Sequence, residues 1–140
     1  MACGSAPEPV STDCPGGNVS GGVCVISCAT QDACRAMAIE CPAGLPCRVQ
    51  CSGKNSCKDA VISCADAYPC EVECTGNSGC AGASIACSED GPCSVLCGAA
   101  TDACKAAAIE CGGNACVCEN LGTVLPAQTC GTACDCEVCQ

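Results

Sequence analysis

Cysteine is the residue that offers this sequence chemistry in quantity, because it occupies 24 of the 140 positions. A cysteine sulfur can close a disulfide, ligate zinc or copper as a thiolate, or attack as a nucleophile. Histidine is absent, which excludes Ser-His-Asp and Cys-His catalysis and the usual imidazole metal sites. We therefore expect no enzyme and no cofactor, and look for sulfur bonded to sulfur or to a metal.

The cysteines follow a period of 23 residues, which is typical of a stacked repeat. The first row is Cys24, Cys28, Cys34 and Cys41, and three further rows follow, the last with one extra residue. The recurrent Cys-x5-Cys spacing favours local disulfides such as Cys28 with Cys34 and Cys41 with Cys47, although bridges between neighbouring repeats stay an alternative. The proposed disulfide cysteines are Cys28, Cys34, Cys41, Cys47, Cys51, Cys57, Cys64, Cys70, Cys74, Cys80, Cys87, Cys93, Cys97, Cys104, Cys111 and Cys116.

Each repeat also contains two copies of the motif [Val/Ile]-x-Cys-x5-Cys, and each copy predicts a short strand followed by a turn. Residues 47–51 alternate inward cysteine and valine with outward arginine and glutamine, which is the period of a strand. The second strand of each repeat alternates in the same way, so Met37, Ala60, Ala83 and Ala107 should face inward. The fold class predicted is all-β: a small parallel β-solenoid of about four 23-residue coils with a disulfide-filled interior.

Three regions divide the chain in this interpretation. Residues 1–23 form an N-terminal tether and cap, residues 24–118 the cysteine-rich solenoid, and residues 119–140 a cysteine-rich C-terminal cap. The last region contains Cys130, Cys134, Cys136 and Cys139, whose Cys-x-Cys and Cys-x2-Cys spacings also occur in thiolate metal sites. A disulfide-knotted cap is the preferred interpretation, and a zinc or copper site is the alternative.

Composition points to an oxidising compartment. The chain has one aromatic residue, Tyr68, so it cannot build an ordinary apolar core and needs cross-links instead. Such cysteine density is typical of secreted, periplasmic or cell-surface proteins, so we expect an extracytoplasmic location. The net charge of −10 argues against nucleic-acid binding and against electrostatic attachment to anionic lipid. No stretch of the sequence approaches the length of an apolar membrane span.

Two resemblances add to this interpretation. The repeat spacing is similar to that of the disulfide-filled solenoid antifreeze proteins of beetles, which also have small repeats and few aromatics. The segment Ala2-Cys3-Gly4-Ser5, followed by a proline-bearing polar stretch, resembles the start of a mature bacterial lipoprotein. That resemblance implies lipidation of Cys3; the competing interpretation is that Cys3 is a further disulfide partner.

The function expected is that of a non-enzymatic, disulfide-stabilised extracytoplasmic structural or binding protein, carried on the surface as a lipoprotein. The alternative is a thiolate protein that binds zinc or copper, and a lower alternative is an ice-binding protein with a flat face. The second-strand column needed for ice binding is interrupted by Glu40, Val61 and Glu110. For partners we expect a membrane only through the lipid anchor, no nucleic acid, a protein or surface ligand of unknown identity, and end-to-end self-association through exposed strand edges.

Overall fold

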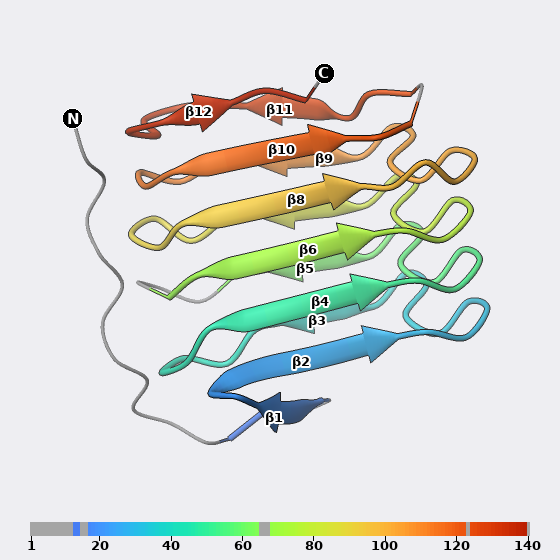
Figure 1. The fold of residues 1–140 in the computed structure, drawn as a ribbon, viewed down its shortest axis with the longest axis horizontal. Helices are drawn as coiled ribbons and strands as arrows, with labels where there is room; N and C mark the ends of the chain where they lie inside the picture. Colours follow the sequence, from blue (N-terminus) through green and yellow to red (C-terminus); the bar gives the residue numbers. More distant parts are fainter. Residues whose placement is uncertain (1–12, 15–16, 65–67, 123, 140) are drawn as a thin grey trace.

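The computed structural model describes residues 13–14, 17–64, 68–122 and 124–139, and these residues form two facing β-sheets (Figure 1). Within them no helix is long and apolar enough to cross a membrane. The first sheet has seven strands, β1 (Asn18–Ser20), β2 (Val23–Cys28), β4 (Cys47–Cys51), β6 (Cys70–Cys74), β8 (Cys93–Cys97), β10 (Cys116–Asn120) and β12 (Cys136–Glu137). The second has five, β3 (Ala38–Glu40), β5 (Val61–Ser63), β7 (Ser84–Ala86), β9 (Ala108–Glu110) and β11 (Ala127–Thr129).

The chain winds alternately through the two sheets, so strands one repeat apart pair in parallel. The order β2-β4-β6-β8-β10 in one sheet and β3-β5-β7-β9-β11 in the other is that of a solenoid, as the sequence predicted. Register follows the repeat: Cys24 lies opposite Cys47, and Cys47 opposite Cys70. The only antiparallel pair among the described strands is β1 with β2, at one end of the stack.

The stack has about five coils, whereas the sequence predicted about four. Strands β10 and β11 continue both sheets through residues that were expected to belong largely to the C-terminal cap. The cysteine pattern had faded there, because Asn120 lies opposite Cys97 and Gln128 opposite Ile109. Backbone pairing needs no particular side chain, so the coil continues although one cysteine and one isoleucine of the pattern are replaced.

Aliphatic side chains fill the space between the sheets in two columns. Val49, Val72 and Val95 lie on the first sheet, and Ile62, Ile85 and Ile109 on the second, all at most 1% exposed. Small alanines at positions 60, 83 and 107 are equally buried. Stacked identical side chains pack at the strand spacing of about 4.8 Å, so each coil covers the apolar residues of its neighbours.

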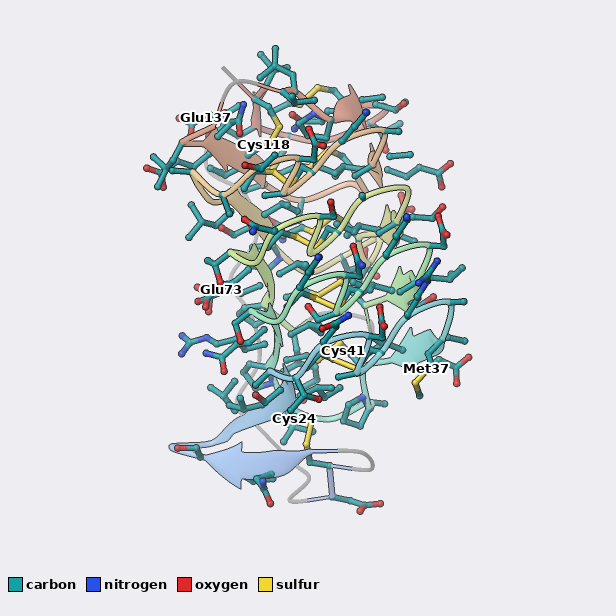
Figure 2. All side chains as sticks on the ribbon, turned by 90° about the vertical axis from the view of Figure 1, so that its right-hand side faces the viewer. Cys24, Met37, Cys41, Glu73, Cys118 and Glu137 are labelled. Atoms are coloured by element: carbon teal, nitrogen blue, oxygen red, sulfur yellow. A yellow bond between two sulfur atoms is a disulfide. The ribbon has the colours of Figure 1, made fainter. Side chains whose placement is uncertain are left out.

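Met37 departs from the inward direction expected for its column. Its side chain is 51% exposed, whereas Ala60 is buried at the equivalent position of the next coil. Strand β3, which follows Met37, is the outermost strand of its sheet, so no further described coil covers that end. Figure 2 shows Met37 at the rim of the stack, while the sulfur atoms run along its interior.

The turns after the first strand of each coil stack as regularly as the strands. Backbone amides of Cys34, Cys57 and Cys80 donate to carbonyls of the next coil at 2.6–2.8 Å. Two positions of each turn adopt positive φ, where small or amide-bearing residues are favoured. The first of these columns is Asp32, Asn55, Ser78 and Asp102, and the second is Ala36, Asp59, Gly82 and Ala106.

Deleting residues 47–69 removes one whole coil, and we expect the shortened chain to fold with no free thiols. The deletion brings Cys41 within six residues of Cys70, which is the spacing of the native Cys41–Cys47 bond. Nearest-neighbour stacking then re-forms across the junction. Far-UV circular dichroism and a thiol count under denaturing conditions measure the outcome. Deleting only residues 47–57 is the control: it removes three cysteines, and must leave an odd thiol and disrupt the stack.

Replacing Ala106 with glycine should raise the free energy of unfolding by about 0.5–1 kcal/mol, because it relieves a left-handed alanine at φ 58°. The reverse change, Gly82→Ala, should lower it by more than about 1 kcal/mol. At that position φ is 69°, and an added Cβ would also displace the carboxylate of Asp59. Guanidinium unfolding with disulfides intact measures both. Ala81→Gly, in the same turn without positive φ, is the control and should destabilise.

Candidate functional site

Disulfides form two columns along the stack, and these are the principal chemical feature of the described chain. One column joins the end of each second-sheet strand to the next first-sheet strand: Cys41–Cys47, Cys64–Cys70, Cys87–Cys93, Cys111–Cys116 and Cys130–Cys136, with Cys14–Cys24 at the start. The other closes each turn: Cys28–Cys34, Cys51–Cys57, Cys74–Cys80 and Cys97–Cys104. Within these two columns, the bonded cysteines are separated by five to seven residues apart from Cys14–Cys24.

The four C-terminal cysteines considered as metal ligands are placed in disulfides. Cys130 bonds to Cys136, Cys139 bonds to Cys118, and Cys134 is also disulfide-bonded. A sulfur in a disulfide has no thiolate to donate to zinc or copper. The described residues contain no free cysteine and no cluster of three or more metal-ligating side chains. Cys3, the candidate for lipidation, lies outside the described residues.

Cys130 and Cys136 continue the disulfide column of the lower coils. Their separation of six residues equals that of Cys41–Cys47, and Cys136 lies opposite Cys116 in the sheet. The Cys-x5-Cys spacing was the signal that could have identified this bond from the sequence. The neighbouring Cys-x-Cys spacing is also typical of thiolate metal sites, so the sequence alone left both interpretations open.

The last coil is closed by a set of side-chain interactions that the sequence did not predict. Gln128 lies where the lower coils have isoleucine. Its Nε2 donates to the carbonyl of Glu137 at 3.2 Å, and its Oε1 accepts from the amide of Cys139 at 3.0 Å. Cys118 replaces the valine of the other inner column and bonds to Cys139. One amide and one disulfide therefore hold the final segment over the ends of both aliphatic columns.

A shallow apolar groove of about 480 Å³ runs along the first sheet, across successive coils. Its repeated members are the residues that precede each first-sheet strand: Pro46, Pro69, Pro92 and Ala115. Each of these offers its carbonyl to an amide of the preceding coil, as Pro46 does to Cys24 at 2.8 Å. Proline fits the column because the interaction requires the carbonyl and not an amide proton. Glu71 and Ser94 line the polar side of the groove.

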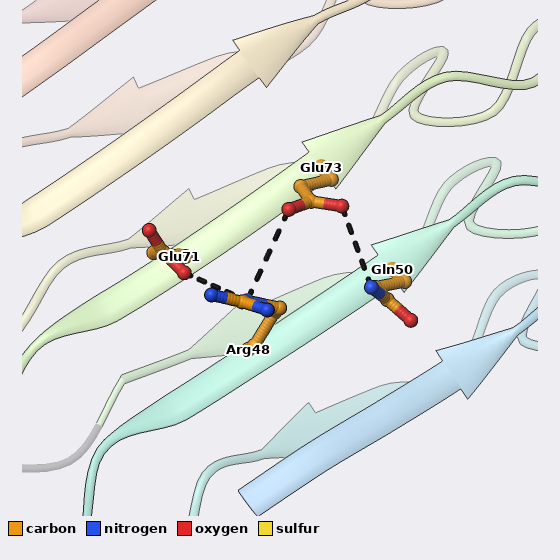
Figure 3. Close-up of polar contacts among 4 residues, drawn as sticks. All are labelled: Arg48, Gln50, Glu71 and Glu73. Atoms are coloured by element: carbon orange, nitrogen blue, oxygen red, sulfur yellow. Dashed lines mark hydrogen bonds and ion pairs between the residues drawn. The ribbon is translucent and has the colours of Figure 1, made fainter. Parts of the chain in front are cut away.

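Next to the groove, four polar side chains interact across β4 and β6 (Figure 3). The Nε of Arg48 donates to Glu71 at 2.7 Å and lies 3.9 Å from Glu73, to which Gln50 donates at 3.5 Å. The hydrogen bond and charge of Glu71 raise the pKa of Arg48 above its usual value. Stabilisation from a raised basic pKa is lost only above that pKa, so it persists at all physiological pH values.

This polar cluster is a surface contact between coils. The side chains of Arg48 and Glu71 are 40% and 44% exposed, and such pairs contribute about 0.2–1 kcal/mol. Both carboxylates interact with neighbouring cationic or amide groups. The cluster therefore aligns two coils, and its arrangement assigns no acid–base role to either carboxylate.

The outward face of the second sheet is built from small side chains interrupted by carboxylates. One column is Ala38, Val61, Ser84, Ala108 and Ala127, and the other is Glu40, Ser63, Ala86, Glu110 and Thr129. Glu40 is exposed at one end of the second column, and Glu110 is exposed one position before the other end. The regular hydroxyl array that would support ice binding does not form on this face.

These features define a disulfide-rich β-solenoid repeat protein. Comparison with known proteins found no matching family model, no matching curated protein and no matching solved structure.

Replacing Gln128 with isoleucine should loosen the final segment, although it restores the residue type of the column. The change removes the acceptor for the Cys139 amide and the donor to the Glu137 carbonyl. Each lost hydrogen bond costs about 1 kcal/mol, so the loss of both should accelerate hydrogen exchange at Cys139 roughly 30-fold. Exchange at Val72, in the middle of the stack, is the control and should not change. Unaltered exchange at Cys139 would show that the Cys118–Cys139 bond alone holds the segment.

Proposed function

We propose that this chain is a non-enzymatic extracytoplasmic structural protein that serves as a rigid spacer. The observation that supports the proposal is the path of the chain along the stack. Strand β1 lies at one end and β12 at the other (Figure 1), so the two described ends of the chain are separated by the full height of the stack. Chain termini of ordinary compact domains are often close together. A solenoid instead holds apart whatever is joined to its two ends.

Rigidity follows from how each coil is closed. A disulfide that closes a loop of six residues stabilises by about 2 kcal/mol in the chain-entropy model, because it restricts the unfolded chain. Two such bonds recur in most coils, and backbone hydrogen bonds join each coil to the next. Five coils at about 4.8 Å each give a stack roughly 20–25 Å tall. Its stiffness does not depend on a large apolar core.

The extracytoplasmic part of the proposal is supported by the disulfides. Bonds in such number form and persist in oxidising compartments and are rare in the cytosol. The proposed attachment is a lipid on Cys3, as the resemblance of residues 2–5 to a lipoprotein start implies. The spacer would then project from the membrane surface with β12 at its distal end.

Intact-mass spectrometry of the native protein, alkylated under denaturing conditions, tests compartment and anchor together. We expect an acyl modification on the N-terminal peptide and at most one alkylated thiol per chain. Because 24 is even and the structure leaves no described cysteine free, a lipid on Cys3 would require one of the described disulfide-bonded cysteines to be a free thiol. The absence of any alkylated thiol would therefore count against the anchor. The count of alkylated thiols by itself tests whether the cysteines of the stack are disulfide-bonded in the native protein.

The control is the Cys3→Ser chain, which should lose the acyl mass and leave the membrane fraction while keeping the disulfides of the stack. An unmodified Cys3 within a disulfide would remove the anchor from the proposal but leave the spacer. Many alkylated thiols together with bound zinc or copper would replace the whole proposal by the thiolate metal-binding alternative.

A further inference from the structure

The exposed large apolar side chains of this protein gather at the two ends of the stack. Six such residues occur among the described positions, and only Val61 belongs to an inner coil. Val19 and Met37 lie at the β1 end, and Leu121, Leu125 and Val138 follow β10 or β12 at the other. An apolar patch on an otherwise polar surface usually marks a contact site.

The β12 end contains a hollow of about 640 Å³. Strand β12 pairs only with Cys116 and Val117, so it leaves the second half of β10 uncovered on that side. Leu121 and Val138, which are 57% and 49% exposed, line this hollow together with Glu119 and Glu137. The site therefore combines an apolar wall with two carboxylates.

The opposite end carries the complementary groups. Met37 projects at the rim beside β3, whose outer edge pairs with no described strand (Figure 2). Arg35 lies two positions earlier, with a side chain that is 47% exposed and forms an ion pair with Asp32 at 3.5 Å. An unpaired strand edge with a flexible apolar side chain can associate with another chain.

Charge is distributed unequally along the stack: basic residues are concentrated toward the β1 end and acidic residues toward the β12 end. Residues 23–64 contain four of the five basic residues, Arg35, Arg48, Lys54 and Lys58, against three acidic ones. Residues 68–139 contain only Lys105 against nine acidic residues: Glu71, Glu73, Glu89, Asp90, Asp102, Glu110, Glu119, Asp135 and Glu137. Contact between unlike ends is therefore favoured electrostatically, and contact between two β12 ends is disfavoured.

We infer that the partner of each end is a second copy of this chain, bound head to tail. Met37 of one copy enters the hollow beside Leu121 and Val138 of the next, and Arg35 faces Glu119 and Glu137. The end of a two-sheet stack is narrow, so the contact is smaller than the roughly 1,600 Å² of a stable complex and is weak and concentration-dependent. Because the two surfaces differ, the contact leaves both outer ends free to bind further copies. This inference is independent of the lipid anchor and of the spacer role.

Two variants test the contact, each with one end blocked by a carboxylate: Met37→Asp and Leu121→Asp. Sedimentation velocity on the wild-type chain should show an average mass that rises with concentration and falls with added salt. Each variant alone should remain monomeric, with an association constant reduced about 10-fold or more. Mixing the two should restore a one-to-one dimer and nothing larger, because only one competent pair of ends remains.

Val61→Asp is the matched control, since Val61 is 49% exposed and Met37 is 51% exposed. It adds the same charge to an inner coil and should associate like the wild type. Circular dichroism and a thiol count verify that every variant is folded. A wild-type chain that stays monomeric at about 1 mM would overturn the inference, as would a mixture of the blocked variants that does not associate.

Discussion

Local sulfur–sulfur bonding is the interaction on which the rest of this structure depends. With one aromatic residue in 140, the chain cannot bury the apolar area that normally offsets conformational entropy. Cystine takes the place of bulky side chains twice in most coils, at the end of a turn and at the return to the first sheet. The valine and isoleucine columns can be thin because the covalent bonds already hold the sheets together.

The coils are held to one another by side chains and hydrogen bonds that repeat from coil to coil. Because each coil presents the same side chains at the same height, Val49 meets Val72 and Ile62 meets Ile85 without any adjustment of register. Even the turns contribute, since their amides bond to carbonyls of the neighbouring coil. Specific polar contacts such as Arg48 with Glu71 add alignment between individual coils but are not required for the architecture.

The repeated part of the fold could be predicted because one coil contains all the information needed to place the next. The period of 23, the alternation around Val49 and the Cys-x5-Cys spacing together define strands, interior and local bonding. The ends could not be predicted in this way, because a terminal coil has a neighbour on one side only. Met37 is exposed for that reason, and the fifth coil was missed because Asn120 and Gln128 replace its pattern-bearing residues.

The proline-lined groove and the hollow at β12 also could not be predicted from the sequence. The proline-lined groove depends on which outward residues of adjacent coils come into line, and a strand pattern alone does not give the depth of that surface. The hollow at β12 depends on where pairing with β10 stops, which is set by the two-residue length of β12. Both surfaces depend on how residues of different coils are placed relative to one another, whereas the cysteine spacing can be read directly from the sequence.

The short separation between bonded cysteines also determines how such a protein can be made. With 24 cysteines the number of alternative pairings grows combinatorially, yet nearly every described partner lies five to seven residues away. Short loops close fastest and at the least entropic cost, so each bond can form without waiting for the repeats that follow it in the chain. Oxidation can then proceed vectorially from the N-terminal side, each finished coil serving as the template for its successor.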